Sequence, residues 1–142
     1  MKLVQHLLDV KGADIISIVR DASVYDAISL MADHGVGSLL VMEGEKIVGI
    51  ITERDYARKV ILKGRSSETT KVEEVMSTDV ITAAAEQSVQ ECMTLMTEKR
   101  IRHLPVVAGN RVIGMISIGD LVQAIISDQQ LEIEQLGNYI SG

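Results

Sequence analysis

The sequence predicts an α+β fold made of two copies of one β-α-β-β-α unit. The first observation is an internal repeat: residues 14–61 align without gaps with residues 79–126, at a constant offset of 65 that pairs Asp14 with Asp79. About a quarter of the paired positions are identical, among them glycines, apolar residues and the aspartates Asp55 and Asp120. The second observation is that both copies show the same succession of β-rich runs and helical apolar spacing. Because this period is too long for a solenoid, we expect a tandem duplication.

The first half of each copy reads as a short strand followed by a helix. The β-rich runs are Ile15–Val19 and Val80–Thr82. A serine followed three residues later by an acidic residue then predicts a helix N-terminus of the capping-box type. These pairs are Ser23 with Asp26 and Ser88 with Glu91. Apolar residues continue at helical spacing, and Gly35 is expected to end the first helix.

The second half of each copy reads as a hairpin followed by another helix. The predicted strands are Ser38–Met42 with Lys46–Ile51, and His103–Val107 with Arg111–Ile116. Turns containing Gly44 and Gly109 connect them. The closing helices are expected from about Glu53 to Leu62 and from about Gly119 onward.

The predicted domain boundaries follow the repeat. Residues 1–62 form the first unit with an apolar prelude, 63–71 form a polar linker, and 72–142 form the second unit with a C-terminal helix. A unit of ~50 residues buries too little apolar surface to be stable alone. We therefore expect the copies to pack around a pseudo-twofold axis, with two related but unequal ligand clefts at their seam.

Composition excludes several classes of function. The net charge of −6 disfavours a nucleic-acid partner and an anionic membrane surface. The absence of Phe and Trp removes the best platforms for base stacking. No apolar run approaches the ~18 residues of a membrane span. A single cysteine, Cys92, and an N-terminus unlike a signal peptide predict a cytoplasmic location.

One motif recurs where a strand leads into a helix. Its pattern is Gly-x-x-[Thr/Ser]-x-x-Asp, represented by Gly49, Thr52 and Asp55 and by Gly114, Ser117 and Asp120. Free N–H groups at a helix start favour anions, and a carboxylate can accept hydrogen bonds from a cis-diol such as ribose. The alternative is that both motifs are simply capping boxes. The two roles are compatible, because a capping hydroxyl keeps spare lone pairs.

In these features the chain resembles a tandem pair of cystathionine-β-synthase-type (CBS) domains, or Bateman module, over essentially its whole length. The motifs that carry the resemblance are the doubled Gly-x-x-[Thr/Ser]-x-x-Asp element and the runs Thr52–Lys59, Arg102–Val107 and Ser117–Val122. It is similar to free-standing bacterial CBS pairs of the signal-transduction type. The resemblance implies a regulatory module without catalytic activity. Its ligand would be an adenine compound such as AMP, ADP, ATP, NAD(H) or S-adenosylmethionine, and its downstream protein partner is unknown.

The resemblance also implies roles for individual residues. Asp55 with Thr52, and Asp120 with Ser117, would hold ribose or phosphate oxygens. Arg102 and His103 would face the phosphates of the second site. Their counterparts Gly37 and Ser38 lack charge, so Arg54, Arg58 and Lys59 are expected to compensate in the first site. Aliphatic walls would enclose the adenine: Ile16, Val36 and Ile50 in one site, and Ile81, Ile101 and Met115 in the other.

Each of these assignments has a structural alternative. Arg58 and Lys59 could be a solvated helix face, Arg102 could pair with an acidic neighbour, and His103 could be a histidine at the edge of the core. Cys92 and the methionines Met31, Met93, Met96 and Met115 are expected in the core or at a helix interface. The histidines are widely spaced along the chain, so no metal site is predicted.

Two rival functions remain. An enzyme would need dissimilar catalytic partners, whereas the repeat gives Asp55 and Asp120 the same role, so catalysis is not expected. A ligand-free dimerisation or partner-binding module is the second rival. It is favoured by the uncharged Gly37 and Ser38 and by apolar residues near the C-terminus, namely Leu121, Val122, Ile125, Ile126, Ile133, Leu136 and Ile140. A homodimer formed through the Met-rich helices is expected.

Overall fold

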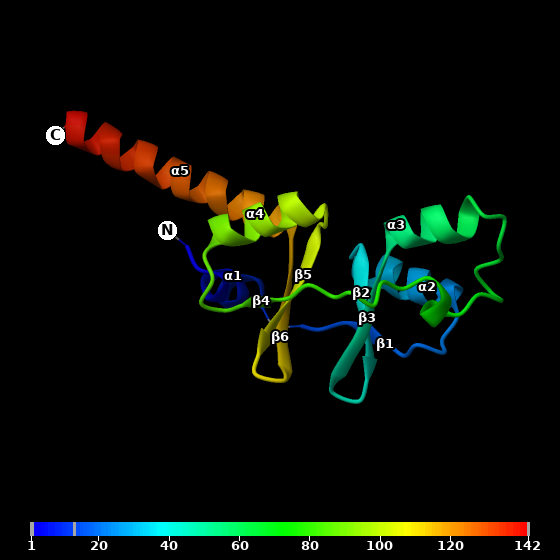
Figure 1. Cartoon of the computed structure of the whole chain (residues 1–142). Coiled ribbons are helices and arrows are strands. Elements are labelled where there is room, and N and C mark those ends of the chain that lie inside the picture. Colours follow the sequence, from blue (N-terminus) through cyan, green and yellow to red (C-terminus); the bar gives the residue numbers. More distant parts are fainter. Residues whose placement is uncertain (1, 13, 142) are drawn as a thin grey trace. The chain divides into compact units, whose positions relative to one another are not determined.

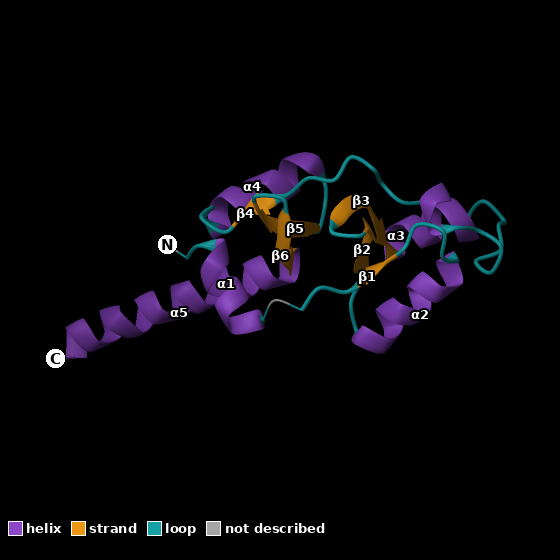
Figure 2. Ribbon diagram, turned by 90° about the horizontal axis from the view of Figure 1, so that it is seen from below, coloured by secondary structure: helices purple, strands orange, loops and turns teal. Residues whose placement is uncertain are grey.

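A computed structural model describes residues 2–12 and 14–141 of the chain, with side chains up to residue 138 (Figure 1). The fold is α+β, as predicted. Contacts divide the chain into two compact units. The central unit comprises Ile15–Ile81, and the terminal unit comprises Met1–Asp14 together with Thr82–Gly142. Each unit holds one three-stranded mixed sheet and its helices (Figure 2).

The central unit follows the predicted β-α-β-β-α order. Its elements are β1 (Ser17–Ile18), α2 (Val24–His34), β2 (Ser38–Glu43), β3 (Lys46–Thr52) and α3 (Glu53–Tyr56), followed by a π-helical turn, η1 (Ala57–Ile61), and a 3₁₀ turn, η2 (Val72–Glu74). In the sheet, β1 runs parallel to β2, and β2 forms an antiparallel hairpin with β3. Nine of the unit's buried side chains form a core cluster: Val24, Ala27, Met31, Leu39, Val41, Ile51, Val60, Val72 and Val75.

The segment predicted as a linker, 63–71, packs onto α2. The backbone N–H of Val24 donates to the carbonyl of Thr70 (2.8 Å), and that of Tyr25 donates to the carbonyl of Ser67 (2.9 Å). Thr70 is buried. The first N–H groups of a helix have no partner within it, so these carbonyls satisfy α2 at its N-terminus. The polar, aperiodic composition of residues 63–71 therefore gave no indication that they cap α2.

The terminal unit repeats the order and adds a helix in front. Its elements are α1 (Val4–Lys11), β4 (Ala83–Ala84), α4 (Val89–Lys99), β5 (His103–Ala108), β6 (Arg111–Ser117) and α5 (Ile118–Ser141). Strand β4 runs parallel to β5, and β5 pairs antiparallel with β6. The second predicted β-rich run, 80–82, is not a strand, because pairing with β5 begins at Ala83.

The N-terminal prelude belongs to the terminal unit and not, as expected, to the unit that follows it in the chain. The N–H of Val4 donates to the carbonyl of Gln87 (2.9 Å), and Leu7 and Leu8 of α1 are buried. Gly114 makes this possible, because a Cβ atom there would collide with the Leu8 side chain. The mirror case is Gly49 of β3, where a Cβ atom would lie 2.6 Å from the sulfur of Met76. Both repeated glycines thus leave room for a side chain from a preceding segment, Leu8 at Gly114 and Met76 at Gly49.

Two local expectations have different outcomes. Gly35 ends α2 in the left-handed conformation (φ 64°), as predicted. The helix expected from Glu53 to Leu62 is instead divided: α3 ends at Tyr56 and the π-helical η1 follows. Such π turns widen the hydrogen-bonding pattern and shift the side chains that follow, which a periodicity of 3.6 residues cannot reveal.

Candidate functional site

Both repeated motifs form complete capping boxes. In the terminal unit, the N–H of Ser117 donates to Oδ2 of Asp120 (2.8 Å) and the N–H of Asp120 donates to Oγ of Ser117 (3.2 Å). In the central unit, the corresponding bonds between Thr52 and Asp55 measure 3.0 and 3.1 Å. The capping alternative is therefore confirmed as geometry, and each aspartate is fixed at the first turn of its helix.

Strand pairing brings the predicted phosphate residues beside these helix starts. His103 lies opposite Ser117 in the hairpin, and the carbonyl of Arg102 accepts from the N–H of Ile118 at 2.9 Å. In the central unit, Ser38 lies opposite Thr52. There the carbonyl of Gly37 accepts from the N–H of Glu53 at 3.1 Å. Each unit thus gathers its own hydroxyl, its aspartate, the residue before the second strand of its sheet and the first residue of that strand.

The charged candidates differ in their surroundings. Arg54, Arg58 and Arg102 are exposed, and within residues 2–12 and 14–141 none of them forms an ion pair. The acidic partner that was the structural alternative for Arg102 is thus not found among the described residues. Lys59 instead donates to the carbonyl of Val75 (2.9 Å) and lies 3.2 Å from Oδ1 of Asp55. It is part of the aspartate's environment and not merely a solvated residue.

Sequence reasoning missed Lys11. Its ammonium, at the C-terminal end of α1, donates to Oδ2 of Asp120 (2.7 Å) and to the carbonyl of Met115 (2.8 Å). Lys11 lies before the repeat begins, and the offset of 65 pairs it with Met76. No local pattern marks it, because only the packing of α1 against the terminal unit brings it to Asp120.

The environment keeps the Asp120 carboxylate ionised. Desolvation raises its pKa, but the hydrogen bonds from Lys11 and from the N–H of Ser117 outweigh this effect, so the pKa lies below its ordinary value of 3.8. Because the folded pKa is depressed, the ionised group stabilises the folded state above that ordinary value. This contribution is lost as the pH falls through the lowered pKa. At neutral pH Asp120 therefore acts only as a hydrogen-bond acceptor.

The six predicted adenine walls are all half-buried. Ile16, Val36 and Ile50 lie in the central unit, as expected for one set. Ile101 and Met115 lie in the terminal unit, whereas Ile81, predicted to join them, lies in the central unit. The reason is that residues 72–81 pack with the central sheet: Ser77 forms a bridge with Ile50 of β3.

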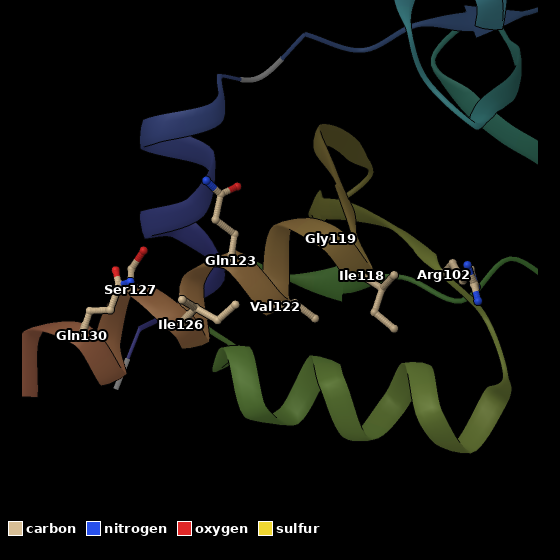
Figure 3. A pocket seen from close by; sticks show the side chains of 8 residues that line it. All are labelled: Arg102, Ile118, Gly119, Val122, Gln123, Ile126, Ser127 and Gln130. Atoms are coloured by element: carbon tan, nitrogen blue, oxygen red, sulfur yellow. The ribbon is translucent and has the colours of Figure 1, made fainter. Parts of the chain in front are cut away.

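An open pocket of about 550 Å³ lies in the terminal unit along α5 (Figure 3). Its lining residues are Arg102, Ile118, Gly119, Val122, Gln123, Ile126, Ser127 and Gln130. Of the predicted ligand residues only Arg102 contributes to it. Ser117, His103 and Asp120 do not line this pocket.

The remaining candidates belong to the core. Cys92 is buried, and this burial raises the pKa of its thiol, so it is a poor nucleophile. Met31 and Met96 are buried within their own units. Their side chains are therefore unavailable for the expected Met-rich dimer contact, while Met93 and Met115 are half-buried.

No cluster of three metal-ligating side chains occurs among the described residues. In the same part of the chain, no helix is long and apolar enough to cross a membrane.

A family model for the CBS domain matches residues 9–62 and again residues 72–127. The chain belongs to the CBS-domain family. The two matches fall on the two copies of the repeat, and each includes one capping-box aspartate. Between them lie the residues that the structure packs against α2.

Known CBS proteins resemble the chain over most of its length. It is 46% identical to the CBS domain-containing protein CBSX3, mitochondrial, of Arabidopsis thaliana, over 86% of this chain and 62% of that protein. The chain thus spans less than two thirds of that relative. It is 31% identical to CBS domain-containing protein YhcV of Bacillus subtilis, covering 85% of this chain and 86% of the other. Both relatives are named for their CBS domains alone.

Solved structures agree with the fold. A protein with CBS domains from Burkholderia ambifaria MC40-6 superposes with a TM-score of 0.87 at 52% identity, covering 90% of this chain and 96% of the other. The CBS domain pair of protein MJ0100 superposes with a TM-score of 0.80 at 27% identity, covering 90% and 98%. That structure is a complex with 5′-methylthioadenosine and S-adenosyl-L-methionine.

Proposed function

We propose that this CBS pair is a regulatory module that binds adenine nucleotides and signals their presence to a protein partner, without catalysing a reaction. The observation that supports the proposal is that the Asp120 carboxylate is ionised and fixed in one orientation. Its Oδ2 atom accepts hydrogen bonds from Lys11 and Ser117. Both bonds converge on Oδ2 and not on Oδ1. An ionised carboxylate that is oriented through one oxygen, at a helix start, suits a ribose diol.

Neighbouring charges favour a ligand that carries phosphate. Arg102 is exposed and without an ion-pair partner among the described residues, and its carbonyl is bonded to the start of α5. An arginine in this position can bind phosphate oxygens bidentately. The adenosyl ligands of the MJ0100 domain pair support an adenine compound as the class of ligand. AMP, ADP, ATP and NAD(H) all combine adenosine with phosphate, and we take AMP as the simplest probe.

Thermal melting with nucleotides tests this proposal. A ligand at ~100 times its dissociation constant, binding only the folded state, adds roughly 2.7 kcal/mol to stability. This corresponds to a rise of several degrees in Tm for a chain of this size. We expect AMP to produce that rise and GMP to produce much less, because aliphatic walls offer no partner for the 2-amino group of guanine.

Two results would contradict the proposal. Equal shifts with AMP and GMP would show that the base is not recognised. An unchanged Tm at millimolar concentrations of AMP, ATP and NAD(H) alike would show that the chain does not bind this class of ligand. Adenosine serves as the matched control for the contribution of phosphate.

Partner binding is the second candidate, and α5 favours it. Ile133 and Leu136, both predicted for this surface, are 68% and 61% exposed, and Leu131 on the same helix is 54% exposed. Of the other predicted residues, Leu121 is buried and Ile140 lies outside the described side chains. A solved CBS-CP12 protein from cyanobacteria, 28% identical to this chain, is hexameric. We propose a homodimer as the simplest closed assembly. Sedimentation as a monomer at micromolar concentration would argue against it. The proposed compartment remains the cytoplasm.

A further inference from the structure

A lysine ammonium contacts the helix-start aspartate in each unit. Lys11 does so at Asp120, and Lys59 does so at Asp55. Both ammonium groups also donate to a backbone carbonyl of a neighbouring segment. Both lysines are about 40% exposed, whereas the aspartates are only 13–25% exposed. Each largely buried carboxylate is therefore paired with a lysine ammonium that is itself partly exposed to solvent.

The two lysines do not correspond in the repeat. The counterpart of Lys59 is Ala124, which is buried and carries no charge, and the counterpart of Lys11 is Met76. Duplication of one unit therefore does not explain the pair of contacts. Each unit obtains its cation from a different element, the π-helical η1 in one case and α1 in the other. The two units therefore share a lysine at the aspartate, although the two lysines occupy different positions in the repeat.

We propose that Lys11 is a positioning residue of the nucleotide site at Asp120, and that it fixes the carboxylate so that Oδ1 receives the ribose diol. This inference rests on the proposed function. The contacts from Lys11 and from the N–H of Ser117 both converge on Oδ2. They hold the side chain in one orientation before any ligand arrives, so binding does not have to immobilise it.

The same comparison predicts that the two sites are unequal. In the central unit, Oδ2 of Asp55 accepts from Thr52 and Oδ1 lies 3.2 Å from Lys59. Both oxygens are therefore occupied, and a diol at Asp55 must compete with Lys59. At Asp120 the lysine and the cap N–H both bond Oδ2, so a diol that binds Oδ1 displaces neither of them.

The test compares two ligands that differ in one hydroxyl, AMP and 2′-deoxy-AMP, by calorimetric titration of the full chain. We expect Lys11→Met to weaken AMP binding at the tighter site by about tenfold, the scale of coupling between groups in one network. Binding of 2′-deoxy-AMP, which lacks part of the diol, should change by less than about twofold, within the limit for uncoupled groups. Lys11→Arg should restore most of the affinity for AMP, because it returns a cation.

Lys2→Met is the matched control. Lys2 lies in the same N-terminal segment and pairs with Asp128 of α5 at 3.6 Å, so its substitution removes the same charge away from Asp120. It should bind both ligands as the wild-type protein does. If Lys11→Met melts below the assay temperature, Lys11→Gln replaces it and should show the same selectivity between the two ligands.

The outcomes separate the two proposals. If the wild-type chain binds no AMP, the proposed function fails and this inference fails with it. If the wild-type chain binds AMP, two results overturn the role of Lys11 alone. One is unchanged AMP affinity in folded Lys11→Met. The other is an equal loss for AMP and 2′-deoxy-AMP, because a general structural effect or a direct phosphate contact would not depend on the 2′-hydroxyl.

Discussion

Replacement of Asp120 by alanine is expected to abolish the tighter nucleotide-binding event. The substitution removes charge-assisted hydrogen bonds to the ribose diol, which contribute about 1.5–3 kcal/mol. By the relation between free energy and affinity, this is a loss of roughly 10- to 150-fold at that site. Asp55→Ala should remove a weaker event, because Lys59 already engages the oxygen that a diol would need. Calorimetric titration with AMP resolves the two.

Capping alone predicts a different pattern. Each aspartate accepts the N–H of Ser117 or Thr52, and losing a cap costs about 1 kcal/mol of stability. Ser23→Ala, which removes the cap of α2 from a place outside the predicted site, measures this cost by itself. If the folded Asp55→Ala/Asp120→Ala double variant binds AMP with wild-type affinity, both aspartates act only as capping residues.

Replacement of Leu39 by alanine is expected to destabilise the central unit by about 2–5 kcal/mol, the usual cost of truncating a buried leucine. Leu39 is fully buried in β2, opposite Ile51 of β3, within the core cluster of that unit. The buried members of the cluster are all aliphatic or methionine, and the one aromatic residue packed against it, Tyr56, is only half-buried. Urea unfolding followed by circular dichroism measures the loss.

Leu62→Ala is the matched control, because the same side chain is 76% exposed there. Its effect should lie within about 0.5 kcal/mol of zero, as for most surface substitutions. Similar losses for the two variants would mean that Leu39 is not in a packed core. They would also challenge the β2–β3 register that places Ser38 beside Thr52.

The sequence was sufficient to predict the repeated unit and the capping boxes, because both depend on local signals. Apolar periodicity identified α2 and α4, and the motif spacing located Asp55 and Asp120. Strand pairing then followed from the hairpins, which placed Arg102 and His103 beside the start of α5.

The features that the sequence did not predict all depend on contacts between distant segments. Lys11 and Asp120 are 109 residues apart in the chain, and only the docking of α1 joins them. Because of the same docking, the N-terminal segment belongs to the terminal unit. Residues 63–71, expected as a linker, pack on α2 and belong to the central unit. A repeat in the sequence suggests units that are continuous in the chain. The N-terminal segment instead packs where its apolar side chains fit, as Leu8 does against Gly114.

A crystal structure of the chain grown with AMP is the most direct test of nucleotide recognition by the capping-box aspartates. We expect the ribose hydroxyls within hydrogen-bonding distance of Oδ1 of Asp120, with Lys11 still bonded to Oδ2 and Arg102 toward the phosphate. AMP bound with its ribose away from both Asp120 and Asp55 would contradict the account, as would crystals from saturating AMP that show no nucleotide at either aspartate.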